Sequence, residues 1–140
     1  MKTLITLIAV LFVGCGESET SRLEAEAKAK ISKEDLLKKS VVGTYETKEG
    51  ADTFRLIILE NGKFENLLSV KVLGSPSQKT VAKGTWKFEA KEVHVLEDGR
   101  EFASVFKIES NGDLKQIANK SSSSRKGIPK ENQITFKKIK

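Results

Sequence analysis

From Val41 onward, apolar and polar residues alternate with a period of two, which is typical of strands with one buried face. Three dipeptides of the hairpin-turn type, Asn61-Gly62, Asp98-Gly99 and Asn111-Gly112, interrupt this alternation. The segment Gly74–Ser77 marks a further break. The pattern predicts eight strands, at about 41–47, 53–60, 63–71, 80–88, 91–96, 101–108, 114–119 and 133–138.

Alternation also assigns the inward face of several strands. In the strand at 80–88, Ala82, Gly84, Trp86 and Phe88 share one side. The other apolar positions that alternation places together on one side of their strands are Phe102, Phe106 and Ile108, and Ile134 and Phe136.

The strand at 53–60 differs from the others because it is apolar on both faces. Such a strand is usually covered on both sides. The nearest candidate in the sequence is a short helix around Leu36 and Leu37, which we expect to cover the outer face. A partner protein or the membrane surface is the alternative cover.

Sequential hairpins of this number form an antiparallel meander, which avoids exposed edges by closing into a barrel. A barrel of eight strands is just wide enough to be filled by side chains or to hold one small ligand. Because the strands are short and many aromatic residues compete for the interior, we expect a filled core. These residues are Tyr45, Phe54, Phe64, Trp86, Phe88, Phe106 and Phe136. A roomy cavity lined by them would reverse this expectation.

The segment 16–40 has helical rather than strand periodicity. Ser21 and Glu24 have capping-box spacing, and Leu23 and Ala27 recur on one helical face. A second start signal at Ser32 precedes the short helix around Leu36 and Leu37. The segment is therefore predicted to be a short helical tether ahead of the barrel.

The apolar run Leu4–Val13 follows Lys2 and ends just before Cys15. It is too short to span a hydrocarbon core of about 30 Å, but it has the layout of a secretory signal. The tetrapeptide ending at Cys15 resembles the lipobox of bacterial lipoproteins. The resemblance implies that Cys15 is lipidated, as in palmitate-bearing lipoproteins, and becomes the first residue of the mature chain. Because Gly16 rather than Asp follows, it further implies sorting to the cell outer membrane, with the periplasmic or surface face left open.

The expected organisation is therefore a signal peptide at 1–14, a lipidated cysteine with its helical tether at 15–40, and a barrel domain at 41–140. Within the barrel, Gly43-Thr44-Tyr45, the strand that ends at Gly62, Gly84-Thr85-Trp86 and Val93-His94-Val95 resemble the small bacterial lipocalin-like domains. The resemblance covers about 41–117. It implies an all-β, antiparallel eight-stranded meander barrel that acts as a binding module for a small apolar ligand.

Residues suited to catalysis are few. His94 is the only histidine and Cys15 the only cysteine, so we expect no metal site and no cofactor. The sequence contains no nucleophile elbow, phosphate-binding loop or zinc-protease motif. We therefore expect a protein that is not an enzyme. Since His94 lies between Val93 and Val95, we expect it to point away from their face, as a surface or hydrogen-bonded residue.

The formal net charge of +6 is concentrated near the C-terminus. Residues 114–140 carry eight basic side chains and a single acidic one, Glu131. Such a segment attracts anionic lipid head groups or acidic glycans of the envelope. Candidate contacts are Lys120, Arg125, Lys126, Lys130, Lys137 and Lys138. An ordinary solvated loop is the competing interpretation, whereas nucleic acid is disfavoured because no aromatic residues are interleaved with the cations.

Overall fold

The computed structural model describes residues 19–72 and 74–139. The chain divides into two compact units, residues 1–32 and 33–140. Helix α1, Glu19–Val41, passes through this boundary. In the first unit the described residues are helical and carry an exposed ion pair, with Arg22 Nε 3.5 Å from Glu26 Oε1. None of the described helices is long and apolar enough to cross a membrane.

The helical tether was predicted with a new start at Ser32, and this detail is wrong. Helix α1 continues through Ser32 without a break. The surrounding Ala, Glu and Lys residues favour helix strongly. A serine within such a run lowers the stability of the helix by only about 0.5 kcal/mol relative to alanine. A potential capping residue therefore does not end a helix that its neighbours continue.

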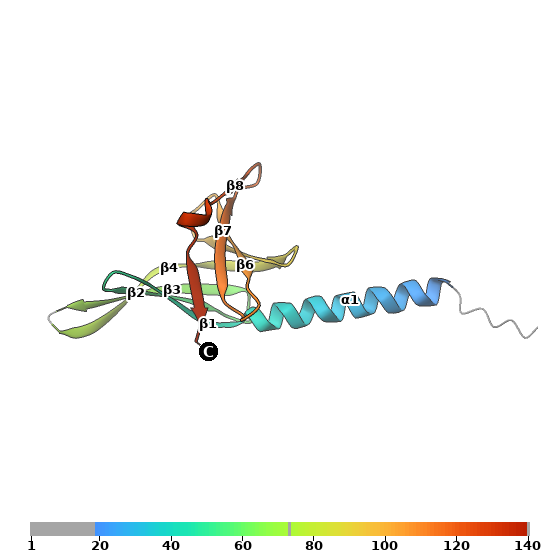
Figure 1. The fold of residues 1–140 in the computed structure, drawn as a ribbon, viewed down its shortest axis with the longest axis horizontal. Helices are drawn as coiled ribbons and strands as arrows, with labels where there is room; N and C mark the ends of the chain where they lie inside the picture. Colours follow the sequence, from blue (N-terminus) through green and yellow to red (C-terminus); the bar gives the residue numbers. More distant parts are fainter. Residues whose placement is uncertain (1–18, 73, 140) are drawn as a thin grey trace, which may run out of the picture. The chain divides into compact units, whose positions relative to one another are not determined.

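All eight predicted strands are present in the second unit (Figure 1). One short strand, β8, was not predicted. The strands are β1 (Gly43–Glu49), β2 (Asp52–Ile58), β3 (Lys63–Val72), β4 (Ser75–Glu89), β5 (Glu92–Glu97), β6 (Ala103–Ile108), β7 (Leu114–Lys120), β8 (Arg125–Gly127) and β9 (Thr135–Lys138). A short 3-10 helix, η1 (Lys130–Asn132), precedes β9.

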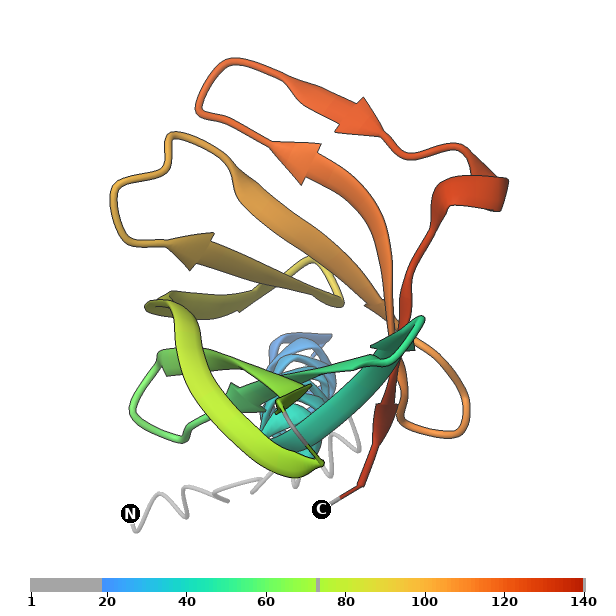
Figure 2. The same ribbon diagram turned by 90° about the vertical axis from the view of Figure 1, so that its left-hand side faces the viewer.

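The strands pair in the order β6-β5-β4-β3-β2-β1-β9-β7, and a further pairing of β6 with β7 closes the ring. The result is a closed eight-stranded antiparallel barrel, and Figure 2 looks into its ring of strands. Strand β8 lies outside the ring, because it pairs only with the last residues of β7. These residues are available because β9 pairs with β7 only at Leu114 and Lys115.

Strand β4 starts earlier than predicted. It pairs with β3 from Ser75 onward, so the two form a ribbon beyond the end of β2. Pro76 lies in this ribbon rather than in a break. The position tolerates proline because, among the described strands, β4 pairs there with β3 alone, so its other edge has no strand partner at that point.

The turns at 59–62, 90–91 and 109–113 form one end of the barrel, which we call the closed end. Val41, in the last turn of α1, is 1% exposed there and belongs to the core. Tyr45 donates its hydroxyl to the carbonyl of Val41 at 2.6 Å, and Trp86 donates Nε1 to the carbonyl of Leu59 at 2.7 Å. The two large aromatic residues therefore fill this end while keeping their polar atoms bonded.

The expectation that Leu36 covers the outer face of β2 is wrong, whereas Leu37 is half-buried. Leu36 is 64% exposed, and the outer face of β2 is half-buried by its neighbours in the sheet. Ile57, on that face, lies between Thr44 and Glu65 in the register, and this is sufficient shielding for an isolated apolar side chain.

Candidate functional site

The opposite end of the barrel, formed by the turns at 50–51, 73–74 and 98–102, is not filled; we call it the open end. A cavity of about 330 Å³ occupies the interior below it. Phe64, Phe106 and Phe136 line this cavity, and the rings of Phe106 and Phe136 meet edge to face with centroids 5.9 Å apart. The predicted filled core is therefore wrong at this end, although Tyr45 and Trp86 do fill the closed end.

Polar side chains also project into the cavity, and they lie on the inward positions of their strands. Asn66 follows Phe64 on β3 with the same orientation, and Ser104 precedes Phe106 on β6 in the same way. Strand β7 contributes Gln116, which donates its amide nitrogen to Ser104 Oγ at 3.2 Å and to Asn119 Oδ1 at 3.3 Å. In this part of the barrel interior, the lining therefore consists of side-chain amides and a hydroxyl as well as apolar groups.

Asn66 differs from the other members of this cluster. Its Oδ1 atom is buried and has no hydrogen-bond partner, although Asn66 is one of the residues that line the cavity. A buried acceptor without a partner costs about 1–3 kcal/mol. Among the described residues that line the cavity, Asn66 is therefore the one with a buried side-chain atom that lacks a hydrogen bond.

The rim of the cavity combines apolar side chains with one ion pair. Phe102 is 52% exposed and Ile134 is 45% exposed, and both line the cavity. At the same rim, Arg100 Nε lies 3.6 Å from Glu97 Oε2. The charges at the entrance are thus paired with each other, beside two partly exposed apolar side chains.

The wall of the barrel is incomplete beside this entrance. Strand β1 pairs with β9 only at Tyr45 and Glu46, so the segment 47–49 has no partner on that side. A second hollow of about 310 Å³ lies at this seam and shares Ile134 and Phe136 with the cavity. The seam therefore adjoins the cavity on the side of β9.

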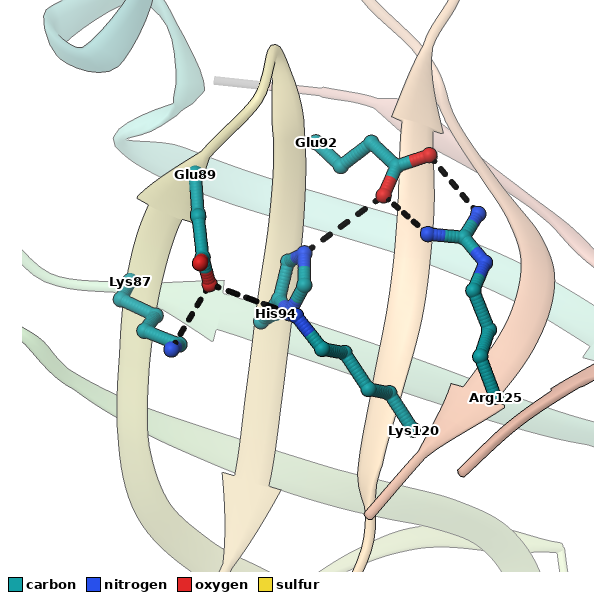
Figure 3. Close-up of polar contacts among 6 residues, drawn as sticks. All are labelled: Lys87, Glu89, Glu92, His94, Lys120 and Arg125. Carbon is teal, nitrogen blue, oxygen red and sulfur yellow. Dashed lines mark hydrogen bonds and ion pairs between the residues drawn. The ribbon is translucent and has the colours of Figure 1, made fainter. Parts of the chain in front are cut away.

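A polar cluster lies on the outer wall around His94 (Figure 3). His94 points away from the face of Val93 and Val95, as predicted, but it is 3% exposed and its Nε2 has no hydrogen bond. Its nitrogens lie 3.9 Å from Glu89 Oε2 and 3.6 Å from Glu92 Oε2, too far for hydrogen bonds. The prediction of a surface or hydrogen-bonded histidine is wrong.

Three cations hold the two glutamates of this cluster. Arg125 forms a bidentate pair with Glu92 at 2.6 and 2.8 Å. Lys87 Nζ lies 2.8 Å and Lys120 Nζ 3.6 Å from Glu89 Oε2. The cluster therefore pins β8 and the end of β7 onto β4 and β5.

These contacts explain the direction of each pKa shift in the cluster. The hydrogen bond from Lys87 lowers the pKa of Glu89, and the hydrogen bond from Arg125 lowers the pKa of Glu92. Burial, assisted by the nearby Lys120, lowers the pKa of His94 despite its two glutamate neighbours. The imidazole is thus held in its neutral form at pH 7.

The structure does not bring the predicted basic contacts together in one place. Lys120 and Arg125 belong to the His94 cluster on β4 and β5. Lys137 and Lys138 pair in register with β1, which stands across the ring from β5. Figure 1 likewise shows β8 well apart from β1.

Three of the predicted contacts, Lys126, Lys130 and Lys137, are exposed. Lys138 is half-buried, donates Nζ to the carbonyl of Ser40 and lies 5.6 Å from the centre of the Tyr45 ring. Cys15, the predicted lipidation site, lies outside the described residues. Binding of an anionic envelope component by these cations stays a prediction.

The cavity residues Asn66, Ser104, Gln116 and Asn119 were missed by sequence reasoning. The signal was present, because Asn66 alternates with Phe64 and Ser104 alternates with Phe102 and Phe106. A polar residue in the middle of an inward-facing apolar series indicates either a buried hydrogen bond or a hollow interior.

The chain matches no family model, and no curated protein and no solved structure is significantly similar to it.

Proposed function

We propose that this protein is a non-enzymatic, membrane-anchored lipoprotein of the bacterial cell envelope whose lipocalin-like barrel binds a small ligand. The observation that carries the proposal is the cavity of about 330 Å³ at the open end of the barrel. Small-molecule sites are typically concave, mostly apolar and about 300–1,000 Å³ in volume, with a few polar groups that fix orientation. Three phenylalanines and the amide cluster meet this description.

The division of the barrel into two halves supports this proposal. Tyr45 and Trp86 close one end with bonded polar atoms, so a ligand has a rigid floor to rest on. The apolar rim at Phe102 and Ile134 provides an entrance of matching character. Apolar surface of this kind releases water favourably when a ligand covers it.

The envelope location is proposed from the sequence. Lys2, the apolar run Leu4–Val13 and Cys15 have the arrangement of a lipoprotein signal. Buried acyl chains contribute about 0.8 kcal/mol per CH₂, so several chains anchor a protein durably. Because Gly16 follows Cys15, we place the anchor in the outer membrane.

Mass spectrometry of the full chain, extracted from the envelope of a bacterial host, tests both parts. The denatured mass should contain the acyl groups, and Cys15→Ser should abolish them. The native mass should exceed the denatured mass by that of a ligand which denaturation releases. A native mass equal to the denatured mass would contradict ligand binding without affecting the anchor.

Two matched substitutions localise such a ligand. Ala82 lines the cavity, whereas its neighbour Val81 is exposed on the strand. Ala82→Phe should displace the extra mass because the new ring occupies the cavity, and Val81→Phe should retain it. Loss of the extra mass in both variants, or in neither, would place the ligand elsewhere.

The alternative function is an interaction module whose basic C-terminal surface contacts anionic envelope components. It is supported by the exposure of Lys126, Lys130 and Lys137. Its test is the salt dependence of binding, which is argued in the Discussion.

A further inference from the structure

We infer that the barrel cavity selects neutral amphiphiles that carry a hydrogen-bond donor, such as a hydroxyl or an amide, and that they enter with this polar group first. This inference rests on the proposed ligand-binding function and names its ligand class. Three features of the cavity carry it: the state of its acceptors, its lack of unpaired charge, and the order of polar and apolar residues along its depth.

The side-chain atom of the cavity lining that is buried without a hydrogen bond is an acceptor. Asn66 Oδ1 is buried without a partner, whereas the amide nitrogen of Gln116 is already donated to Ser104 and Asn119. A ligand hydroxyl or amide N–H satisfies such an oxygen once the Asn66 carboxamide turns it toward the cavity, and the terminal torsion of an asparagine side chain is soft enough to allow this. A carboxylate offers only acceptors and leaves this oxygen unpaired.

The ligand group that meets Asn66 is neutral because no opposite charge is available at that depth. Among the described residues that line the cavity, the charged ones are Glu97 and Arg100, which lie at the rim and pair with each other. An ionised group taken out of water without a counter-charge is costly even where hydrogen bonds are available. Both an ammonium and a carboxylate are therefore disfavoured, and the carboxylate more strongly.

The register shows that the polar group lies deeper than the apolar entrance. Asn66 pairs with Leu56 and Gln116 pairs with Phe106, so both amides lie within the strands rather than at their ends. Phe102 and Ile134 lie nearer the rim and are about half exposed. A ligand with one polar end therefore satisfies both regions only when its head points inward and its apolar body contacts the rim.

Four probes that share an eight-carbon chain test the selectivity: octan-1-ol, octanamide, octylammonium and octanoate. Dissociation constants are measured by calorimetry at pH 7.5 on the full chain carrying Cys15→Ser, which lacks the anchoring thiol, with the same buffer for all four probes. Octan-1-ol and octanamide should bind on the order of tenfold more tightly than octylammonium, a difference of about 1.4 kcal/mol, because the ammonium is taken out of water without a counter-charge. Octanoate should bind most weakly, because it carries the same penalty and also leaves the Asn66 acceptor unpaired.

Variants at Asn66 show whether this residue determines the selectivity for the head group of the probe. Asn66→Leu should remove the advantage of the two neutral donors, and Asn132→Leu, at an exposed asparagine of η1, should leave it unchanged. Asn66→Asp should instead favour octylammonium over octan-1-ol, because it supplies the missing counter-charge. This reversal is a gain that damage to the fold does not produce.

The outcomes separate the inference from the function on which it rests. If all four probes bind equally well and Asn66→Leu changes nothing, the cavity binds ligands but the inferred selectivity is overturned. If octanoate binds most tightly, the inference is likewise overturned. If none of the probes binds but native spectra still show an extra ligand mass, the inferred ligand class is wrong while the ligand-binding function stands. If none of the probes binds and the native spectra show no extra mass, both the ligand class and the ligand-binding function are wrong.

Discussion

The hydroxyl of Tyr45 donates a hydrogen bond of 2.6 Å to the backbone carbonyl of Val41. Val41 is in the last turn of α1 and Tyr45 is in β1, so the bond fixes the point where the helix enters the barrel. The carbonyl belongs to a helix end, where backbone acceptors lack an intrahelical partner. Both residues are fully buried, so this single hydroxyl satisfies an acceptor that water does not reach.

Tyr45→Phe should destabilise the barrel by roughly 1–2 kcal/mol, because the Val41 carbonyl then stays buried without a partner. Urea unfolding followed by Trp86 fluorescence measures this change, since Trp86 is the only tryptophan. The dependence on urea should keep its slope, because the substitution leaves the exposed area unchanged. A variant as stable as the wild type would show that the bond contributes nothing.

The same tyrosine should make the protein unstable in alkali. Burial, together with the charge of Asp113, raises the pKa of Tyr45 to about 12. Between pH 10 and 12 the unfolded chain therefore releases the phenolic proton that the folded chain retains, so stability falls as the pH rises, by roughly 2–3 kcal/mol in total. Since the chain has one tyrosine, absorbance of phenolate reports the transition directly. Titration at pH 10 in the folded protein would contradict it.

Gly84→Ala should destabilise the barrel more than an ordinary surface change. A Cβ at this position would lie 2.1 Å from the carbonyl oxygen of Leu96 and 2.8 Å from Cε1 of Phe64. Backbone cannot move away as a side chain can, so we expect a loss of about 1–3 kcal/mol. Gly127→Ala is the matched control, because nothing lies within 4 Å of its Cβ. Equal thermal midpoints for the two variants would contradict the close packing of β4 on β5.

Strand positions followed from the sequence because they depend on local signals, and barrel closure followed because a meander of this length otherwise leaves its edge strands exposed. Alternating apolar residues set the faces, and turns such as Asn61-Gly62 set the hairpins. The cavity did not follow, because the volume left inside a barrel depends on how side chains from different strands meet. Seven aromatic residues indicated a full interior, yet only the closed end is full, since Asn66 and Ser104 occupy inward positions toward the open end.

The outer wall was harder to predict for a related reason. The charged groups around His94 include Lys87 and Glu89 of the neighbouring hairpin strand β4, but also Lys120 of β7, which is distant in the sequence. Strand β8 itself has no apolar alternation, because its three residues are Arg125, Lys126 and Gly127. It forms only because β9 leaves the end of β7 unpaired, a consequence of the ring and not of the local sequence.

Stability should also decrease as the pH falls through the range in which a free histidine titrates. The folded pKa of His94 is below its ordinary value, so the unfolded chain binds the proton first. The contribution is therefore present above about pH 6.5 and is lost progressively below it. Urea midpoints at pH 7.5 and 5.5 measure the effect, and His94→Leu should reduce the difference between them. The glutamates of the cluster titrate at lower pH, so an unchanged difference in the variant would exclude His94 as the source.

Binding to anionic envelope surfaces, if it uses the basic C-terminal segment, should depend on the exposed cations and not on those held by glutamates. Reversing Lys126 and Lys130 to glutamate should weaken binding to vesicles that contain an anionic phospholipid, since each exposed cation near such a surface contributes about 1 kcal/mol. Lys48→Glu together with Lys79→Glu is the matched control, because both lysines are exposed but lie outside this segment. Cosedimentation at 50 and 300 mM salt measures the effect, which should diminish steeply as the screening length shortens. Equal binding at both salt concentrations, or equal losses in the two double variants, would leave the cavity as the site through which this protein acts.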